Sequence, residues 1–512
     1  MAELTPASGT PAGEGVHPPG DYPVVVIGSG PGALQVSHSL HALGIGAATI
    51  SSDLAPGGMF RRWPHFQRLL SWTKPHAPVP QGTRAYERYD WNSLLGDTPD
   101  TRAIQPGLMD GSSYFPSRPE MEANLAAFAE RSGIQIRYGC TWTGTRREEG
   151  PEGERFIVET TDGEYRTQVM IVAVGVAQPH TPPSPGMEFA HHYADVRAAE
   201  TYADRRVLIV GKQNSGFELA SGLLPWASQL ILSSPSPAKL SVDTRSLVGV
   251  RARYVQPYED HVLGGGVSVL DAAIDRIERG QDETLHVTLR RTDGGGDLTA
   301  TVDDVIAATG FVCPLVDLPD LGVATFGASR LPAQTAWWES TTVPGIHFAG
   351  TIGQGSKGLL RHGMPSNSGA VHGARYNARL MARYLAETRF GIELPRAPIE
   401  RSHLVDWVAM ELAEAPELWH QKGYLARVAT VDPSAGLIDD DVQPLAHVLD
   451  DHTHDGVAVT LEADGTGAIY PVLYVRSGGR LSEHAIDPDP LLRYDGPLTR
   501  KAIAAAVGAL AG

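Results

Sequence analysis

Apolar and polar residues follow one another along this chain in the order of an α/β protein. The β-branched run from Val24 to Ile27 predicts a buried strand. A glycine-rich turn, GSGPGA, comes next, followed by Leu34, Val36 and Leu40 at helical spacing. Residues 47–50 predict a second strand. The order of strand, tight turn, helix and strand indicates a βαβ unit with parallel strands.

The same order recurs in the middle of the chain. Residues 207–210 predict a strand, GKQNSG a turn, and the following residues a helix and a strand at 229–232. A β-hairpin that delivers a buried strand ending in glycine is predicted at residues 155–175 and again at 285–310. This repetition indicates two related βαβ units, the second nested inside the first.

The rest of the chain separates into a long loop, two helices and a different C-terminal segment. Residues 77–112 predict the loop, and Ser117 stands three residues before Glu120, the spacing of a capping box, ahead of a helix at 121–132. A second helix is predicted at about 370–385. Residues 399–428 look helical, and residues 455–476 predict two strands joined by the turn EADGTG.

We therefore predict an α/β fold with two Rossmann-like dinucleotide-binding domains and a small α+β C-terminal extension. The predicted division is a disordered tail at 1–20, a first domain at 21–195 and 301–395, an inserted domain at 196–300, and the extension at 396–512.

The first glycine-rich turn has the spacing of a dinucleotide-binding motif. Gly28 permits the tight turn, Gly30 lets the backbone approach a pyrophosphate, and Ala33 lets helix and strand pack. The helix N-terminus presents N–H groups to the phosphates. An acidic residue at the end of the second strand usually binds the ribose; that position is Ser51 here, and Asp53 is the alternative.

The second turn keeps Gly211 and Gly216 but has Gln213 in place of the middle glycine. No carboxylate follows the strand at 229–232, whereas Ser234, Lys239 and Arg245 stand just beyond it. A 2′-phosphate needs such groups, and a bare ribose prefers Asp or Glu. NADPH is therefore favoured over NADH.

Composition narrows the possible partners. The net charge of −17 argues against nucleic acid, and no apolar run approaches the ~20 residues that span a bilayer. The first twenty residues lack the features of a secretory signal, and two cysteines far apart in the sequence fit a reducing setting, so we expect a cytoplasmic protein without a membrane partner. Only two cysteines, Cys140 and Cys313, are present and no C-x-x-C occurs, which disfavours a dithiol centre. No metal site is expected.

Residues 21–390 resemble the two-dinucleotide-binding flavoproteins, and specifically the flavin-dependent (class B-type) monooxygenases. The resemblance rests on GSGPGA, PGGMF, YFPSRPEMEANL, GKQNSGFELA, VIAATGF and GIHFAG. Asn214 and Ser215 are similar to the asparagine–serine pair of that family's NADPH loop. Two departures are the displaced ribose acid and the altered segment Phe189-Ala-His191-His192-Tyr.

The resemblance implies FAD at the first turn, NADPH at the second, and oxygenation through a C4a-hydroperoxyflavin. Lys74 is the first candidate to contact the flavin, and Arg61, Arg84 and His362 are candidates to hold an anionic substrate. The expected cofactor-binding residues are Gly28, Gly30, Gly32, Ala33, Ser51, Asp53, Gly57, Gly58, Met59, Phe60, Trp72, Gly211, Asn214, Ser215, Gly216, Ser234, Lys239, Arg245, Thr309, Gly310 and Gly350.

The expected reaction is N-oxygenation of a small amine or amino acid by O₂ in specialised metabolism, in a possible homo-oligomer. Baeyer–Villiger oxidation and S-oxygenation are alternatives. A flavin reductase of the thioredoxin-reductase-like type that acts on a partner's disulfide, or a redox-inert FAD-binding regulator, is the competing class.

Overall fold

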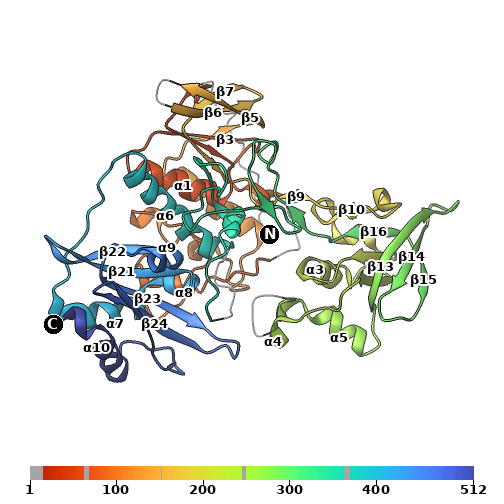
Figure 1. The fold of residues 1–512 in the computed structure, drawn as a ribbon. Coiled ribbons are helices and arrows are strands. Elements are labelled where there is room, and N and C mark those ends of the chain that lie inside the picture. Colours follow the sequence, from red (N-terminus) through yellow and green to blue (C-terminus); the bar gives the residue numbers. More distant parts are fainter. Residues whose placement is uncertain (1–14, 63–67, 151–152, 245–248, 363–368, 512) are drawn as a thin grey trace. The chain divides into compact units, whose positions relative to one another are not determined.

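The computed structural model describes residues 15–62, 68–150, 153–244, 249–362 and 369–511. The chain divides into two compact units (Figure 1). The first unit comprises Met1–Arg61, Ser71–Val176 and Cys313–Gly512, and the second comprises Arg62–Leu70 and Ala177–Val312. Each unit contains one glycine-rich turn, which confirms the expected α/β class with two Rossmann-like folds.

The first unit is built on a five-stranded parallel sheet, in the order β20-β8-β2-β3-β4. Its strands are β2 (Val24–Ile27), β3 (Ala47–Ser51), β4 (Arg137–Tyr138), β8 (Val169–Val172) and β20 (Ile346–Phe348). Val24 and Val26 pack with helices α1 (Pro31–Ala42) and α6 (Val371–Thr388). Val25 and Ile27 face the other way, so β2 is buried on both sides, as a central parallel strand requires.

A four-stranded sheet covers that other side, in the order β1-β7-β6-β5. Its strands are β1 (Gly20–Asp21), β5 (Trp142–Gly150), β6 (Gly153–Thr160) and β7 (Gly163–Thr167), and β6 and β7 form the first predicted hairpin. Helix α2 (Arg118–Arg131) has the predicted capping box: the Ser117 backbone N–H donates to Glu120 Oε2 at 2.6 Å. Short pieces complete this part: η1 (Gly58–Arg61), η2 (Ala85–Tyr89), η3 (Pro99–Thr101), η4 (Gln105–Leu108), β18 (Thr325–Phe326), β19 (Leu331–Pro332) and η9 (Gly350–Gly355).

Of the predicted disordered tail, residues 1–14 lie outside the described residues. The end of that segment is packed, because His17 O accepts a hydrogen bond of 2.8 Å from the Tyr165 hydroxyl and Gly20 belongs to β1. His17 and Gly20 therefore do not belong to a disordered tail.

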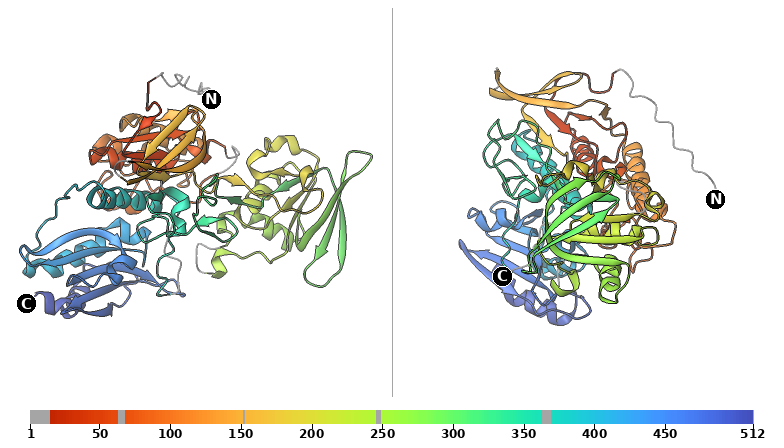
Figure 2. Two further views of the ribbon diagram at one scale, coloured as in Figure 1. Left: turned by 45° about the horizontal axis from the view of Figure 1, so that its top comes forward. Right: turned by 90° about the vertical axis from the view of Figure 1, so that its right-hand side faces the viewer.

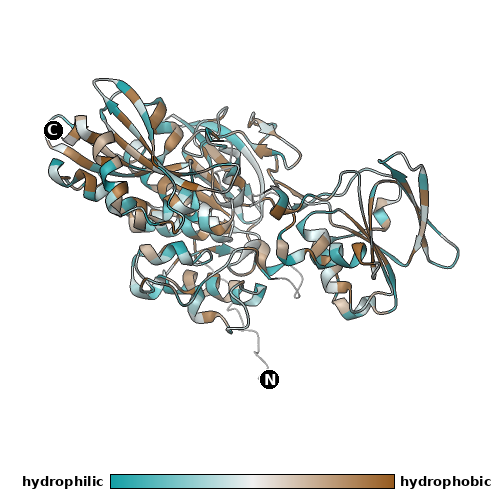
Figure 3. Ribbon diagram, turned by 90° about the horizontal axis from the view of Figure 1, so that it is seen from below, coloured by the Kyte–Doolittle hydropathy of each residue, from teal (hydrophilic) through white to brown (hydrophobic). Residues whose placement is uncertain are grey.

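The second unit, which is coloured mainly olive to green in Figure 2, contains a sheet. The sheet has seven strands in the order β10-β16-β11-β12-β13-β14-β15. Its strands are β10 (His191–His192), β11 (Arg206–Val210), β12 (Gln229–Ser234), β13 (Val267–Arg279), β14 (Leu285–Arg291), β15 (Asp297–Val302) and β16 (Asp304–Ala307). β14 and β15 form the second predicted hairpin. Strands β11 and β16 are apolar after their first residues, Arg206 and Asp304, and brown strands mark the centre of this unit in Figure 3.

Helices and short elements surround this sheet. They are α3 (Asn214–Leu223), α4 (Ser241–Thr244), α5 (Gln256–Val262), β9 (Gln178–Pro179), β17 (Phe311–Val312), η5 (Met187–Phe189), η6 (Tyr193–Asp195), η7 (Ala199–Tyr202) and η8 (Ala252–Tyr254). Phe217 and Leu219 of α3 pack on Val207 and Ile209 of β11, so the helix lies against the strand that precedes the turn.

The C-terminal segment forms an antiparallel sheet in the order β22-β21-β23-β24-β25. Its elements are η10 (Arg401–His403), α7 (Leu404–Glu414), α8 (Pro416–His420), β21 (Leu425–Asp432), β22 (Gly436–Pro444), α9 (Leu445–Asp450), β23 (Gly456–Ala463), β24 (Ile469–Ser477), β25 (Arg480–Ala485) and α10 (Pro497–Ala511). Tyr424, Leu425 and Val442 share a buried cluster with α1 and α6. The extension is therefore continuous with the core of the first unit.

One secondary-structure prediction is wrong here. The helical stretch expected to reach Val428 ends with α8 at His420, and Leu425–Asp432 is a strand. Gly423 separates the two with a φ of +61°, a left-handed conformation that ends a helix. Among the described residues, no helix combines the length and apolar character that crossing a bilayer requires.

Candidate dinucleotide sites

The first glycine-rich turn is held by backbone packed on backbone. Gly28 has a φ of +134°, and a Cβ there would lie 2.6 Å from the carbonyl oxygen of Ala173. A Cβ on Gly32 would lie 2.5 Å from the backbone nitrogen of Gly350. Side chains are thus excluded at both positions, and the turn is locked between the end of β8 and the start of η9.

A second pair of glycines faces the same turn. The Gly57 N–H donates to the Ser29 carbonyl at 3.0 Å, which places the PGG corner against it. A Cβ on Gly30 would lie 3.9 Å from the Gly58 Cα. The predicted residues Met59 and Phe60 follow in η1 and are half-buried.

The N-terminus of α1 and the end of β3 complete this site. No side chain caps α1 at Gly30 and its first turn holds no acidic residue, so its N–H groups and dipole favour an anion. The Ser29 hydroxyl donates to Asp53 Oδ2 at 2.6 Å, and the Asp53 N–H donates to Ser51 Oγ at 3.1 Å. Backbone close to the phosphates and a carboxylate beside the ribose position fit a dinucleotide such as FAD.

The second turn repeats the backbone contacts. Gly211 has a φ of +127°, and a Cβ on it would lie 2.3 Å from the Ala308 carbonyl oxygen. A Cβ on Gly216 would lie 2.1 Å from the Gly211 carbonyl oxygen. Gln213, in the middle position, is exposed and precedes α3, whose first turn holds no acidic residue. These residues also fit a dinucleotide phosphate.

Asn214 fixes the chain that lies beside this turn. Its Nδ2 donates to the Gly249 carbonyl at 3.1 Å, and its Oδ1 accepts the Arg251 N–H at 2.9 Å. Ser215 is the next residue of α3 and is half-buried. Asn214 is thus a structural link between the turn and residues 249–251.

The remaining predicted residues of the second unit lie in two places. Ser234 ends β12 and donates to the Ser236 carbonyl at 3.2 Å, the exposed Lys239 follows, and Arg245 lies outside the described residues. The Thr309 hydroxyl donates to the His180 carbonyl at 2.5 Å, and the Gly310 carbonyl accepts the His180 N–H at 3.1 Å. Thr309 and Gly310 thus fix the chain where it leaves β16.

The residues proposed for catalysis do not share a contact within the described structure. Lys74 and Arg61 are exposed, and the Arg61 carbonyl accepts a bond of 2.8 Å from Arg118. His362 Nδ1 lies 2.6 Å from the Tyr470 hydroxyl, and its Nε2 lies 3.3 Å from Glu483 Oε1. The C-terminal sheet therefore holds His362.

Trp72 belongs to a cluster of tilted aromatic rings that sequence reasoning missed. Its ring centroid lies 4.8 Å from that of Trp91, which in turn lies 4.3 Å from that of His372, the second residue of α6. The ring of His420, from α8, lies 5.2 Å from that of His372, and burial lowers the pKa of His420 well below its usual value. No motif signals these residues, because they come from three distant parts of the chain.

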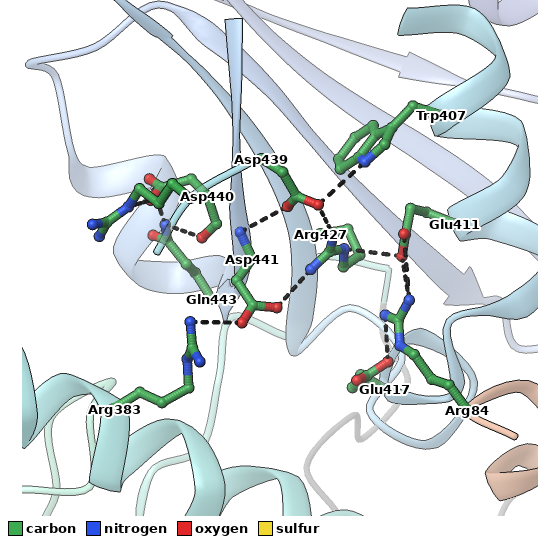
Figure 4. Close-up of polar contacts among 11 residues, drawn as sticks. Arg84, Arg383, Trp407, Glu411, Glu417, Arg427, Asp439, Asp440, Asp441 and Gln443 are labelled. Atoms are coloured by element: carbon green, nitrogen blue, oxygen red, sulfur yellow. Dashed lines mark hydrogen bonds and ion pairs between the residues drawn. The ribbon is translucent and has the colours of Figure 1, made fainter. Parts of the chain in front are cut away.

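An ionic network with Arg427 and Glu411 buried at its centre joins the extension to the rest of the first unit (Figure 4). Arg427 of β21 lies 2.9 Å from Glu411 and 2.6 Å from Asp441, and Arg383 of α6 lies 2.9 Å from Asp441. Arg84, a candidate from the sequence to hold an anionic substrate, pairs with Glu411 at 3.0 Å. The interactions of Arg84 and Arg383 thus attach the extension to the rest of the unit.

The two cysteines lie in one buried cluster of the first unit. Burial raises the pKa of Cys140 above its usual value and raises the pKa of Cys313 to about 12. Both thiols are therefore protonated at neutral pH and shielded from solvent, and neither has the properties of a reactive thiolate.

Two dinucleotide turns in one chain define an oxidoreductase with a flavin and a pyridine nucleotide site. The chain belongs to the pyridine nucleotide-disulphide oxidoreductase family, whose sequence model matches residues 25–350. The family and the matched proteins indicate that FAD and NADPH are its cofactors.

Individual proteins match over most of the chain. FAD-dependent oxidoreductase domain-containing protein 2 of Mus musculus is 27% identical over 455 residues, which are 82% of this chain and 65% of the relative. The chain thus spans slightly less than two thirds of that protein. Indole-3-pyruvate monooxygenase YUCCA1 of Oryza sativa subsp. japonica is 24% identical over 66% of this chain and 87% of its own. The structure of the bacillithiol disulfide reductase Bdr from Staphylococcus aureus covers 72% of this chain and 99% of its own, at a TM-score of 0.56 and 15% identity, and so shares the fold.

Proposed function

We propose that this chain is an FAD- and NADPH-dependent monooxygenase that N-oxygenates a small amine or amino acid. The sequence motifs GSGPGA, YFPSRPEMEANL and GKQNSGFELA carry this proposal. Cys140 and Cys313 are both buried and protonated, so the chain offers no thiol of its own to relay electrons from a flavin, although direct reduction of a partner's disulfide by the flavin would not need one. The motifs shared with flavin-dependent monooxygenases and the similarity to YUCCA1, a monooxygenase by name, support the same reaction class.

The residues of each turn would divide the work between two cofactors. Gly28, Gly30 and Gly32 would admit the FAD pyrophosphate, with Asp53 beside the ribose, in a domain of residues 21–195 and 301–395. Gly211 and Gly216 would admit NADPH in a domain of residues 196–300. FAD, when bound, supplies hydride acceptance and electron transfer to O₂. Backbone N–H groups at the N-termini of α1 and α3 would bind the phosphates.

Reduction of a partner's disulfide is the second candidate function. The family description and the fold shared with the Bdr reductase favour it, because the family and the reductase are both named for reactions of disulfides. In that reaction the disulfide would take electrons from the reduced flavin, and the products would be two thiols rather than an oxygenated amine.

The deciding experiment follows the electrons and the oxygen atoms. In the first assay the purified chain, loaded with FAD, receives NADPH, ¹⁸O₂ and a panel of amines and amino acids. In the second assay it receives NADPH and low-molecular-weight disulfides in the absence of oxygen. We expect an amine to accelerate NADPH oxidation and to yield a hydroxylamine that contains one ¹⁸O atom. Recovery of all electrons as H₂O₂ with every amine, or NADPH oxidation driven by a disulfide without oxygen, would contradict the proposal.

Two cysteine variants separate thiol chemistry from direct flavin chemistry. Cys140→Ala and Cys313→Ala each remove one thiol from the buried cluster, and we expect both to keep the wild-type turnover per bound FAD. Because either variant can lose stability, turnover is normalised to FAD content. Loss of turnover in both soluble, FAD-loaded variants would point to a thiol mechanism instead.

A further inference from the structure

A buried lysine lies in the second glycine-rich turn, directly after Gly211. The Lys212 side chain is 1% exposed, and it forms an ion pair with Asp271. Its Nζ also donates to the Leu270 carbonyl at 2.7 Å. Burying an ammonium is costly without a partner, so Asp271 is the group that makes this position of Lys212 stable.

The ion pair stands at the end of the strand where a Rossmann unit recognises the adenosine ribose. Asp271 lies on β13 opposite Ser234, the last residue of β12, in a parallel register. The Asp271 side chain is 36% exposed, whereas Lys212 is covered. A ligand that arrives at this edge of the sheet therefore meets the carboxylate first.

The first unit has an equivalent arrangement with a neutral donor. Ser29 also directly follows the first glycine of its turn, and its hydroxyl donates to Asp53 beyond the end of β3. In both units the residue after that glycine contacts an acid beside the ribose position. Only in the second unit is that residue a cation, so only there is the charge of the acid cancelled.

A carboxylate at this position accepts a hydrogen bond from a ribose 2′-hydroxyl and repels a 2′-phosphate. We propose that Lys212 admits the 2′-phosphate of NADPH by neutralising Asp271, so that this pair sets the preference between NADPH and NADH. The proposal rests on the pyridine-nucleotide role of the second turn. It does not depend on which substrate the flavin oxidises.

The test measures binding of two adenosine fragments to the FAD-loaded, full-length protein. Titration calorimetry gives Kd for 2′,5′-ADP, which carries the 2′-phosphate, and for 5′-AMP, which lacks it. We expect Asp271→Asn to bind 2′,5′-ADP about tenfold more tightly, and Lys212→Met to bind it about tenfold more weakly. Kd for 5′-AMP should stay within about twofold of wild type in Asp271→Asn, because a 2′-hydroxyl still finds an acceptor.

The double variant Lys212→Met/Asp271→Asn controls for folding, because it removes both charges and leaves no ion unpaired. It should bind 2′,5′-ADP more tightly than Lys212→Met alone. Equal weakening of both fragments in the two single variants would show a purely structural role and overturn the proposal. If the wild type binds neither fragment, the second turn is not a nucleotide site and the proposal fails. This outcome does not depend on whether the protein oxygenates an amine.

Discussion

The two glycine-rich turns share their order of strand, turn and helix but differ at the middle position. In the first turn Gly30 faces Gly58, so two stretches of backbone approach the space in front of α1. In the second, the exposed Gln213 occupies that position, and only Gly211 and Gly216 are closely packed. The two turns therefore differ in how much backbone surrounds the space in front of the helix N-terminus.

The largest effect is expected from Gly32→Ala in the first turn. The new Cβ would lie 2.5 Å from the Gly350 backbone nitrogen, which cannot yield without moving η9. We expect a loss of at least about 2 kcal/mol of stability and nearly complete loss of FAD, measured by flavin absorbance and thermal unfolding. A variant with full FAD content and an unchanged melting temperature would show that the close contact is not needed.

Gly216→Ala makes the corresponding change in the second turn. Its Cβ would lie 2.1 Å from the Gly211 carbonyl oxygen, so the junction of β11 and α3 must open. We expect at least about tenfold weaker binding of 5′-AMP, whereas FAD content stays at the wild-type level because the first turn is unaltered. Parallel loss of FAD would mean that the two turns are not independent.

Gly30→Ala separates cofactor binding from folding. Gly30 has a φ of −79°, which any residue adopts, and its added Cβ would lie 3.9 Å from the Gly58 Cα, an ordinary contact. The protein should fold normally but bind FAD about tenfold more weakly, because the methyl group occupies space in front of the phosphates. The measurement is Kd for FAD after removal and reconstitution. Unchanged affinity would remove Gly30 from the site.

Local features of both units could be predicted from the sequence. The turns, the hairpins and the capping box at Ser117 depend on residues close together in the chain, and the structure has them all. The strand at Leu425–Asp432 was missed because a short segment rich in apolar residues does not distinguish strand from helix. Only Gly423 marks the change.

Contacts between distant residues could not be predicted. Lys212 pairs with Asp271, and His362 contacts Tyr470 and Glu483, which belong to a segment without a recognised motif. The rings of Trp91 and His372 are neighbours only in the folded chain, because His372 lies in α6 and Trp91 in a segment far earlier in the sequence. Spacing along the chain contains no information about such pairs, so the contacts of His362 could not be predicted, and its role at a substrate stays a prediction.

A smaller difference between the turns lies seven residues after the first glycine. In the first unit this residue is Gln35, which is buried and accepts the Leu95 N–H at 2.7 Å. In the second it is Glu218, which accepts hydroxyl groups of Tyr193 at 3.0 Å and Tyr254 at 2.8 Å. Burial raises the pKa of Glu218 to about 7. The second unit thus carries an ionisable group where the first carries a neutral amide.

Glu218→Gln should remove a pH dependence that only the second unit has. Since the folded-state pKa of Glu218, about 7, lies above the unfolded value near 4.3, its stabilisation is complete below about pH 4 and is lost as pH rises through 7. We expect the wild type to lose at most a few kcal/mol between pH 5 and 8 from this group, and Glu218→Gln to lose less over the same range. Denaturant unfolding at each pH, followed through 5′-AMP binding, measures the second unit. Gln35→Glu is the matched converse, and it should introduce such a loss into the first unit, followed through FAD release. Identical pH profiles for wild type and Glu218→Gln would mean that Glu218 stays ionised in the fold, with its two tyrosine hydroxyls compensating for burial.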